Sequence, residues 1–188
     1  MKLIETIKSR VRNLLTEKDN VTYDYSCAML NIKISDNDWE GIQNIINDDE
    51  LYDDEESSFG REDAPHITLL YGIHQDVPFE DVKTIVDTFK PVKITLNKVG
   101  FFANDKFDVI KYEFNDKTLN SYNKKLVELP HTNSYPDYKA HLTLAYVKSG
   151  MGKEISDRFN GIEPTEYECD EIKYSEPDKE KKYIKLTN

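Results

Sequence analysis

The chain has 188 residues, of which 38% are hydrophobic and 32% are charged, and its formal net charge is −11. This length and hydrophobic content predict one globular domain. The acidic charge argues against a protein that coats long nucleic acid duplexes, which requires a basic face, but it does not exclude a small anionic ligand, because charge is screened beyond about 8 to 10 Å.

The expected elements alternate between strands and helices. Apolar residues at helical spacing predict a helix over 2–17, so we assign residues 1–19 as an N-terminal helical extension and 20–188 as the domain. Strands are expected at 21–34, 65–72, 92–102, 107–114, 140–148, 165–174 and 182–187. Helices are expected after Ser35, from Pro78, over 119–129 and near 153–159, with an acidic solvated loop at 47–63. The pattern predicts an α+β fold with antiparallel or mixed sheets, in which 92–102 and 107–114 form one hairpin and the last two strands another.

The sequence carries no sign of a membrane segment, a secretory signal or a thiol site. Its apolar stretches are far shorter than the ~20 residues that cross a bilayer, and its N-terminus lacks an apolar signal core. Cys27 and Cys169 show neither metal-ligand spacing nor a disulfide framework. We therefore expect a cytoplasmic protein with reduced thiols and no membrane partner.

One short motif occurs twice. Residues 65–71 read Pro-His-Ile-Thr-Leu-Leu-Tyr and residues 140–146 read Ala-His-Leu-Thr-Leu-Ala-Tyr. Each is expected to be a strand followed by a turn and a helix, so the repeat predicts two similar lobes. Because side chains alternate along a strand, each histidine shares a face with the threonine two residues later. The same alternation assigns Tyr71 and Tyr146 to the opposite, packing face.

The motif residues suit phosphodiester cleavage. Imidazoles with ordinary pKa values near 6.5 can act as a paired base and acid at neutral pH. His66 and His141 would activate a hydroxyl or water and protonate the leaving oxygen, while the Thr68 and Thr143 hydroxyls would hydrogen-bond the non-bridging phosphate oxygens. This chemistry requires no metal and no other cofactor. Which histidine is the base stays open.

Two other interpretations apply to the same residues. A single strand histidine is more often a core residue capped by its neighbour, but the repetition argues against that interpretation. A zinc site built from His66, His74, His131 and His141 lacks the spacing of known zinc motifs.

These motifs resemble the 2H phosphoesterase superfamily, which is named for two His-x-Thr/Ser strands. The resemblance implies a bilobal α+β fold, with two pseudo-symmetric lobes around a central cleft, and a ribonucleotide substrate with a 2′,3′-cyclic, 2′-5′ or 3′-5′ phosphodiester. The stretches 59–72 and 129–141 further resemble the phage branch, which includes the anti-CBASS nucleases that destroy cyclic oligonucleotide signals such as cyclic GMP-AMP. That resemblance implies a small cyclic di- or trinucleotide as the binding partner and a role in phage counter-defence. A phosphodiesterase of RNA 2′,3′-cyclic ends and a nucleotide sponge that does not cleave are the alternatives.

A nucleotide substrate predicts aromatic side chains near the motifs, since stacking on a base contributes about 1 to 3 kcal/mol. Phe102, Tyr138 and Tyr174 are the candidates for substrate binding, because they lie near hairpin ends or the approach to the second motif. Packing in the core or on the surface is the alternative for each of them. Arg61 and Lys148, which flank the motifs, are candidates for local positive charge, with ordinary surface placement as the alternative.

Overall fold

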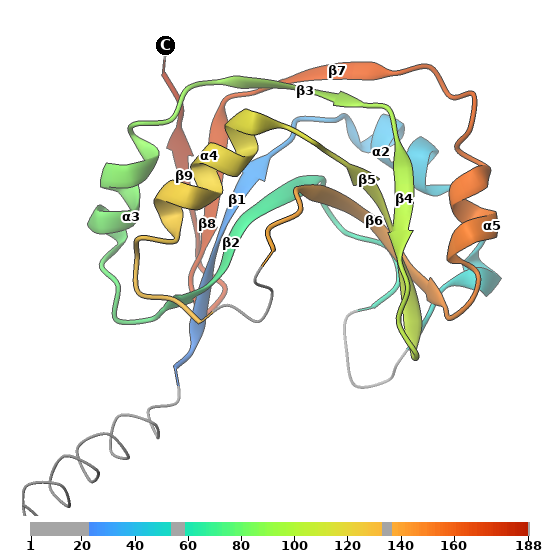
Figure 1. The fold of residues 1–188 in the computed structure, drawn as a ribbon, viewed down its shortest axis with the longest axis horizontal. Coiled ribbons are helices and arrows are strands. Elements are labelled where there is room, and N and C mark those ends of the chain that lie inside the picture. Colours follow the sequence, from blue (N-terminus) through green and yellow to red (C-terminus); the bar gives the residue numbers. More distant parts are fainter. Residues whose placement is uncertain (1–22, 54–58, 133–136, 188) are drawn as a thin grey trace, which may run out of the picture.

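A computed structural model describes residues 23–53, 59–132 and 137–187 (Figure 1). The strands are β1 (Tyr25–Asn31), β2 (His66–His74), β3 (Val92–Leu96), β4 (Val99–Phe102), β5 (Phe107–Glu113), β6 (His141–Lys148), β7 (Thr165–Cys169), β8 (Glu171–Ser175) and β9 (Lys181–Lys185). The helices are α2 (Asp36–Gln43), α3 (Phe79–Val86), α4 (Lys117–Leu126) and α5 (Gly152–Asp157), with a 3₁₀ turn η1 at Asp48–Glu50. The α+β prediction is confirmed. The expected extension over 1–19 lies outside the described residues.

The strands form two antiparallel lobes joined by a ribbon. One lobe is the sheet β2-β1-β8-β9, and the other is the sheet β4-β5-β6. The two-stranded ribbon β3-β7 runs along the top of Figure 1 above both lobes. The motif strands β2 and β6 contact each other in the middle of the molecule. Helices α3 and α4 lie beside the first lobe, and α2 and α5 beside the second (Figure 1).

Two of the expected strands are broken in the structure. Residues 92–102 divide into β3 and β4, which pair with β7 and β5 respectively. Residues 165–174 divide in the same way into β7 and β8, at Asp170, and the expected C-terminal hairpin is formed by β8 and β9. A continuous run of β-forming residues gives no sign of such a break. The break occurs where the strand changes its pairing partner, and that depends on tertiary structure.

The two lobes are tied together by crossed segments. The segment that leads into β2 pairs with β6, through an isolated bridge between Arg61 and Ala145. The segment that leads into β6 pairs with β2, through a bridge between Ile73 and His131. Each motif strand is therefore flanked by the chain that introduces the other motif, and neither lobe can shift its motif strand independently.

The acidic segment 47–63 is less solvated than expected. Glu50 is 5% exposed, and its carboxylate accepts hydrogen bonds of 2.5 and 2.8 Å from the Arg158 guanidinium. Leu51 forms a bridge with Val147 of β6. The prediction of a solvated loop was wrong at Glu50 and Leu51. Glu50 can be buried because its charge is paired with that of Arg158. The adjoining helix α2 begins as expected, since the Ser35 side chain accepts a hydrogen bond from the Asp38 amide.

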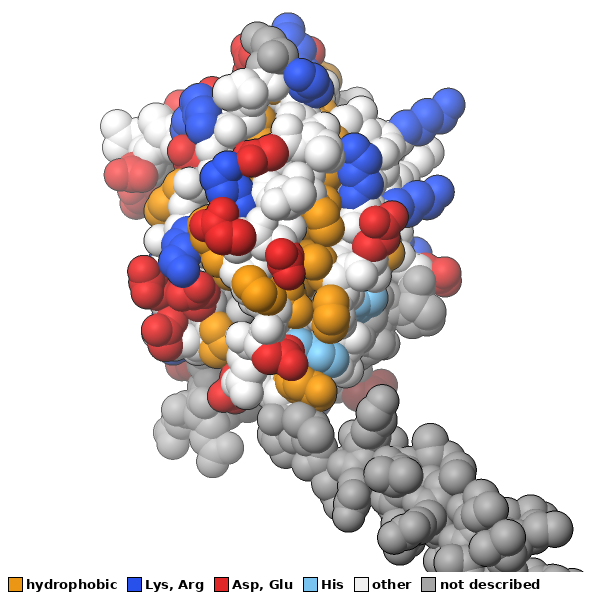
Figure 2. Space-filling model, turned by 90° about the vertical axis from the view of Figure 1, so that its left-hand side faces the viewer, with side chains coloured by type: hydrophobic (Ala, Val, Ile, Leu, Met, Phe, Trp, Pro, Cys, Tyr) orange, Lys and Arg blue, Asp and Glu red, His pale blue; other side chains and the backbone are white. Residues whose placement is uncertain are grey.

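The described part of the chain has no helix that is long and apolar enough to cross a membrane. On the face that carries α3, acidic and basic side chains are interspersed and do not gather in a patch of one sign (Figure 2). Several are paired, as Lys83 is with Asp87 and Lys182 with Glu176, at 2.6 Å in both cases. This face therefore lacks the basic surface that a duplex would require.

Candidate active site

A β-bulge lies at the same position of both motifs. Met29 pairs with Thr68 and Ala28 with Leu70, so Leu69 is the extra residue in β2. In β6 the extra residue is Leu144, which likewise follows the motif threonine. A bulge bends its strand and redirects the side chains beyond it. The repeat in the sequence is thus a repeat of backbone geometry as well.

The packing prediction was wrong for Tyr71, whereas Tyr146 does pack against other rings. Tyr71 is 62% exposed and therefore lies outside the packing layer. Tyr146 is partly buried, and its ring packs near those of Phe59 and Phe107, at centroid distances of 5.1 and 5.4 Å. The simple alternation failed because the extra residue Leu69 turns Tyr71 to the same face as Thr68.

A buried amide side chain holds each bulge. Asn123 of α4 is 9% exposed, and its Nδ2 donates to the Leu69 carbonyl oxygen at 2.7 Å. Gln43 of α2 is 6% exposed, and its Nε2 donates to the Leu144 carbonyl oxygen at 2.9 Å. A buried carbonyl that leaves the strand ladder needs a donor, and the Leu144 carbonyl also accepts from the Glu62 amide at 3.0 Å. The helices therefore support the motif strands directly beside the histidines.

The two motif histidines have matching hydrogen bonds. Nδ1 of His66 lies 2.9 Å from the Ala64 carbonyl oxygen, and Nδ1 of His141 lies 2.8 Å from the Lys139 carbonyl oxygen. A carbonyl oxygen only accepts, so Nδ1 carries the hydrogen in both rings and Nε2 of the neutral ring keeps its lone pair. In both motifs, Nε2 is therefore the atom available for proton transfer.

The pKa values of both motif histidines are lowered, for similar reasons. Burial is the largest cause that lowers the pKa of His66 and of His141 below the ordinary 6.5. The positive charge of His66 further lowers the pKa of His141. Lys173 acts on the pKa of His66, and Lys111 acts on that of His141, in the same direction. These influences favour the neutral form of both imidazoles.

The motif threonines lie in different surroundings. Thr68 hydrogen-bonds the Cys27 thiol, whose pKa burial raises to about 12, so that thiol stays protonated. Thr143 lies opposite Lys111 in the β5–β6 ladder. Both threonines are partly exposed, in keeping with side chains at a ligand site.

The aromatic candidates have three different outcomes. Phe102 lies at the site, with its ring edge-on to His141 at 5.1 Å between centroids. Tyr138 is partly buried, and its hydroxyl donates to the Thr68 carbonyl oxygen at 3.1 Å. Tyr174 is only 2% exposed and packs near Phe79, so its prediction as a base-binding residue was wrong. Its strand turns that side chain into the core, which position in a hairpin could not reveal.

Sequence reasoning missed Tyr183, which is 55% exposed. Tyr183 lies opposite Lys173, Lys173 opposite Met29, and Met29 opposite Thr68, in one row across β9, β8, β1 and β2. Residues directly opposite in a sheet point to the same face, so Tyr183 shares the face of Thr68. The alternation within β9 would have indicated an exposed face, but only strand pairing connects that face to the first motif.

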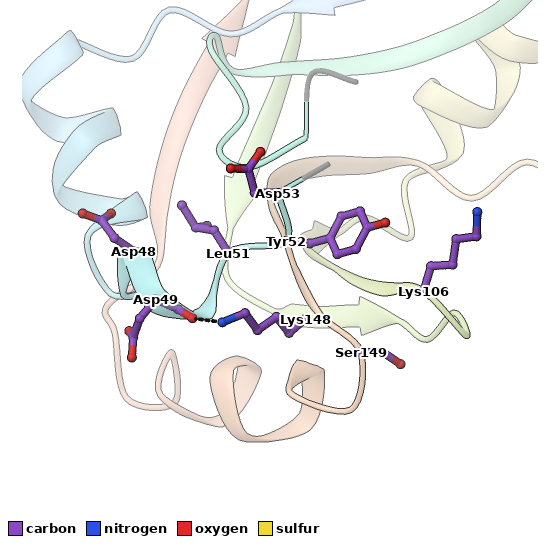
Figure 3. Close-up of a pocket in the computed structure, with 8 residues that line it drawn as sticks. All are labelled: Asp48, Asp49, Leu51, Tyr52, Asp53, Lys106, Lys148 and Ser149. Atoms are coloured by element: carbon purple, nitrogen blue, oxygen red, sulfur yellow. Dashed lines mark hydrogen bonds between the residues drawn. The ribbon is translucent and has the colours of Figure 1, made fainter. Parts of the chain in front are cut away.

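The flanking cations are engaged elsewhere. Arg61 donates to the Asp48 carboxylate at 2.5 Å and to the Ile46 carbonyl oxygen at 2.6 Å. Lys148 donates to the Asp49 carbonyl oxygen at the open pocket drawn in Figure 3. That pocket carries the side chains of Asp48, Asp49 and Asp53, which disfavour an anion there. Neither cation supplies the motif histidines with charge.

The histidines do not gather around a metal position within the described ranges. The one group with suitable geometry there is Glu176, Asp178 and Glu180, in the β8–β9 turn. His74 instead lies with Nε2 2.9 Å from the Thr132 hydroxyl, and His131 with Nδ1 2.8 Å from the Leu129 carbonyl oxygen. Among the described residues, His66 and His141 therefore form no metal-binding group with His74 or His131.

Solved structures with the same architecture support this description. Usb1 from Kluyveromyces marxianus with uridine monophosphate superimposes with a TM-score of 0.61 at 9% identity, over 87% of this chain and 99% of that one. LigT from E. coli complexed with 3′-AMP gives 0.52 at 12% identity, over 88% and 97%. At these identities the likeness concerns the fold. None of the curated proteins compared with the chain matches it.

The bilobal fold, with a His-x-Thr strand from each lobe meeting at its centre, defines a 2H phosphoesterase. The chain belongs to the 2′-5′ RNA ligase superfamily, which matches residues 34–180. The predicted superfamily is therefore confirmed, and the phosphodiesterase class follows with it.

Proposed function

We propose that this chain is a metal-independent phosphodiesterase that hydrolyses small cyclic oligoribonucleotides, such as 3′,3′-cyclic GMP-AMP, with His66 and His141 as the base and the acid. The observation that supports it most is the matched hydrogen bonding of the two rings. Each Nδ1 is bound to a backbone carbonyl, which leaves two Nε2 atoms for the two proton transfers.

The reaction divides between the two rings as follows. The neutral histidine takes a proton at Nε2 from a ribose 2′-hydroxyl or a water, and the oxygen of that group forms a bond to phosphorus. The bond from phosphorus to the leaving oxygen breaks, and the protonated histidine donates its Nε2 hydrogen to that oxygen. When a 2′-hydroxyl attacks, the product is a 2′,3′-cyclic phosphate, and a water can open it with the two histidines in exchanged roles. Thr68 and Thr143 hydrogen-bond the non-bridging oxygens.

Three features favour a small ligand. The net charge of −11 disfavours long RNA, and the face in Figure 2 has no basic patch. Phe102 beside His141 offers an aromatic ring for contact with a base. The resemblance of 59–72 and 129–141 to the phage branch adds the biological role that we propose, which is to silence the CBASS alarm of an infected bacterium.

The direct test is hydrolysis by purified protein in EDTA. We expect conversion of a 3′,3′-cyclic dinucleotide to a linear product, compared with cyclic trinucleotides, 2′-5′ oligoadenylate and RNA that ends in a 2′,3′-cyclic phosphate. Preference for the RNA end would select the alternative phosphodiesterase. Tight binding of the cyclic dinucleotide without cleavage would select the sponge. Activity lost in EDTA and restored by zinc would refute the metal-independent mechanism.

A further inference from the structure

Each lobe contains a nearly buried lysine on its site face. Lys111 of β5 is 2% exposed and Lys173 of β8 is 8% exposed. A lysine is rarely buried to this extent without a partner, because its ammonium loses hydration. Both lysines belong to sheets that contain a motif strand (Figure 1). For each lysine, the question is therefore which group compensates its buried charge.

Strand register brings Lys173 to the first motif. Lys173 pairs with Met29, and Met29 pairs with Thr68, so the lysine and the threonine share one row and one face of the sheet. With strands 4.7 to 4.9 Å apart, their Cα atoms are about 10 Å from each other. Its charge also contributes to the lowered pKa of His66. The ammonium of this long side chain therefore lies on the side of the sheet where the substrate would bind.

The charge of the other lysine is compensated within its own sheet. Nζ of Lys111 lies 2.6 Å from a carboxylate oxygen of Glu113, which also binds Lys98 at 2.7 Å. The two cations lower the pKa of Glu113 to about 2, so its carboxylate stays charged. Nζ of Lys111 also stands 3.9 Å from the centroid of the Phe102 ring. Lys111 thus already has its counter-ion and a ring contact.

Lys173 has no such partner. Among the described residues, none forms a salt bridge with its ammonium: Lys181 repels the charge, and Glu62 attracts it more weakly. Burial is the largest cause that lowers its pKa from the ordinary 10.5. A nearly buried cation without a counter-ion is costly for the fold, and an anion in the cleft would compensate it.

We infer that Lys173 is a phosphate-binding residue, whose ammonium donates to a non-bridging oxygen of the substrate phosphate held between the motifs. This deepens the proposed function, on which it rests for the identity of the phosphate. The lobes then differ in their tasks: the first lobe binds the phosphate charge, and the second holds Phe102 beside His141. In an acidic protein, one buried ammonium supplies the local positive charge that an anionic ligand requires.

The test is ligand binding to Lys173→Met, measured by calorimetry with 3′-AMP and, as the matched ligand without phosphate, adenosine. We expect 3′-AMP to bind about ten- to hundredfold more weakly, as for the loss of one hydrogen bond to a charged group, and adenosine to bind equally. The control Lys182→Met removes a lysine that pairs with Tyr174, on the opposite face of the same sheet, and should leave both affinities unchanged. Unchanged 3′-AMP affinity in Lys173→Met, an equal loss in the control, or no 3′-AMP binding by the unaltered protein would overturn the inference.

Two further measurements separate phosphate binding from a structural role. Since Lys173 is an uncompensated buried charge, its replacement by methionine should leave the melting temperature unchanged or raise it. A variant that fails to fold would show that the lysine is structural and would overturn the inference. The pKa of His66, followed by NMR, should rise in the variant because a nearby positive charge is removed. If the unaltered protein fails to cleave cyclic dinucleotides but Lys173→Met loses 3′-AMP affinity, the proposed function is wrong and the phosphate site stands.

Discussion

Replacement of one motif histidine by asparagine tests the mechanism without disturbing its support. The asparagine amide nitrogen can take over the hydrogen bond that Nδ1 of His141 donates to the Lys139 carbonyl oxygen at 2.8 Å. What the variant lacks is Nε2, the atom assigned to proton transfer. His141→Asn should therefore fold with nearly unchanged stability, and its effect on the rate should report chemistry alone.

The magnitude follows from the number of proton transfers that are lost. A positioned acid or base contributes about 10² to 10⁴ in rate, which corresponds to about 2.7 to 5.4 kcal/mol of transition-state stabilisation. We expect His66→Asn and His141→Asn each to lower kcat/KM for a cyclic dinucleotide at least about 10²-fold. The double variant should lose far less than the product of the two effects, because the two rings act in one step.

His131 provides the matched control. Its Nδ1 also lies 2.8 Å from the carbonyl oxygen two residues earlier, that of Leu129, but it stands outside both motifs. His131→Asn should keep full activity. The assay is product formation in EDTA under single-turnover conditions, with the melting temperature of each variant measured alongside. Full activity in either motif variant, or an equal loss in His131→Asn, would refute the two-histidine mechanism.

Three further predictions address the surroundings of the motifs. Tyr183→Ala should raise KM about five- to tenfold. This is the low end of the effect of base stacking, because the ring is 55% exposed. Tyr183→Phe should keep the KM of the unaltered protein, and equal KM values for the two variants would exclude stacking. The pH profile of kcat/KM should peak below about 6.5, since the acid must be protonated below its lowered pKa and the base neutral above its own; a maximum above pH 7.5 would contradict both shifts. Asn123→Leu should cost about 1 to 3 kcal/mol in urea unfolding, because it leaves the Leu69 carbonyl without its side-chain donor. Gln43→Leu should cost less, because the Leu144 carbonyl still accepts from the Glu62 amide at 3.0 Å. An unchanged unfolding midpoint in Asn123→Leu would show that the first bulge needs no amide support.

The sequence alone was sufficient for the fold class and for the superfamily. Strand and helix periodicity predicted an α+β chain, and the repeated His-x-Thr-Leu-x-Tyr motif identified two lobes and the superfamily. Such patterns are local, because a period of two and a short motif are complete within one strand. The helix start at Ser35 was predictable for the same reason.

Tertiary structure decided everything that depends on which strands are neighbours. It placed Tyr174 in the core and Tyr183 on the site face, although both were only strand tyrosines in the sequence. It also introduced the bulges that expose Tyr71, and it brought Lys173 into the row of Thr68 across an intervening strand. Register is set by pairing between segments that are distant in sequence, as Met29 is from Lys173, so the side chains around the two histidines could not be identified from local pattern alone.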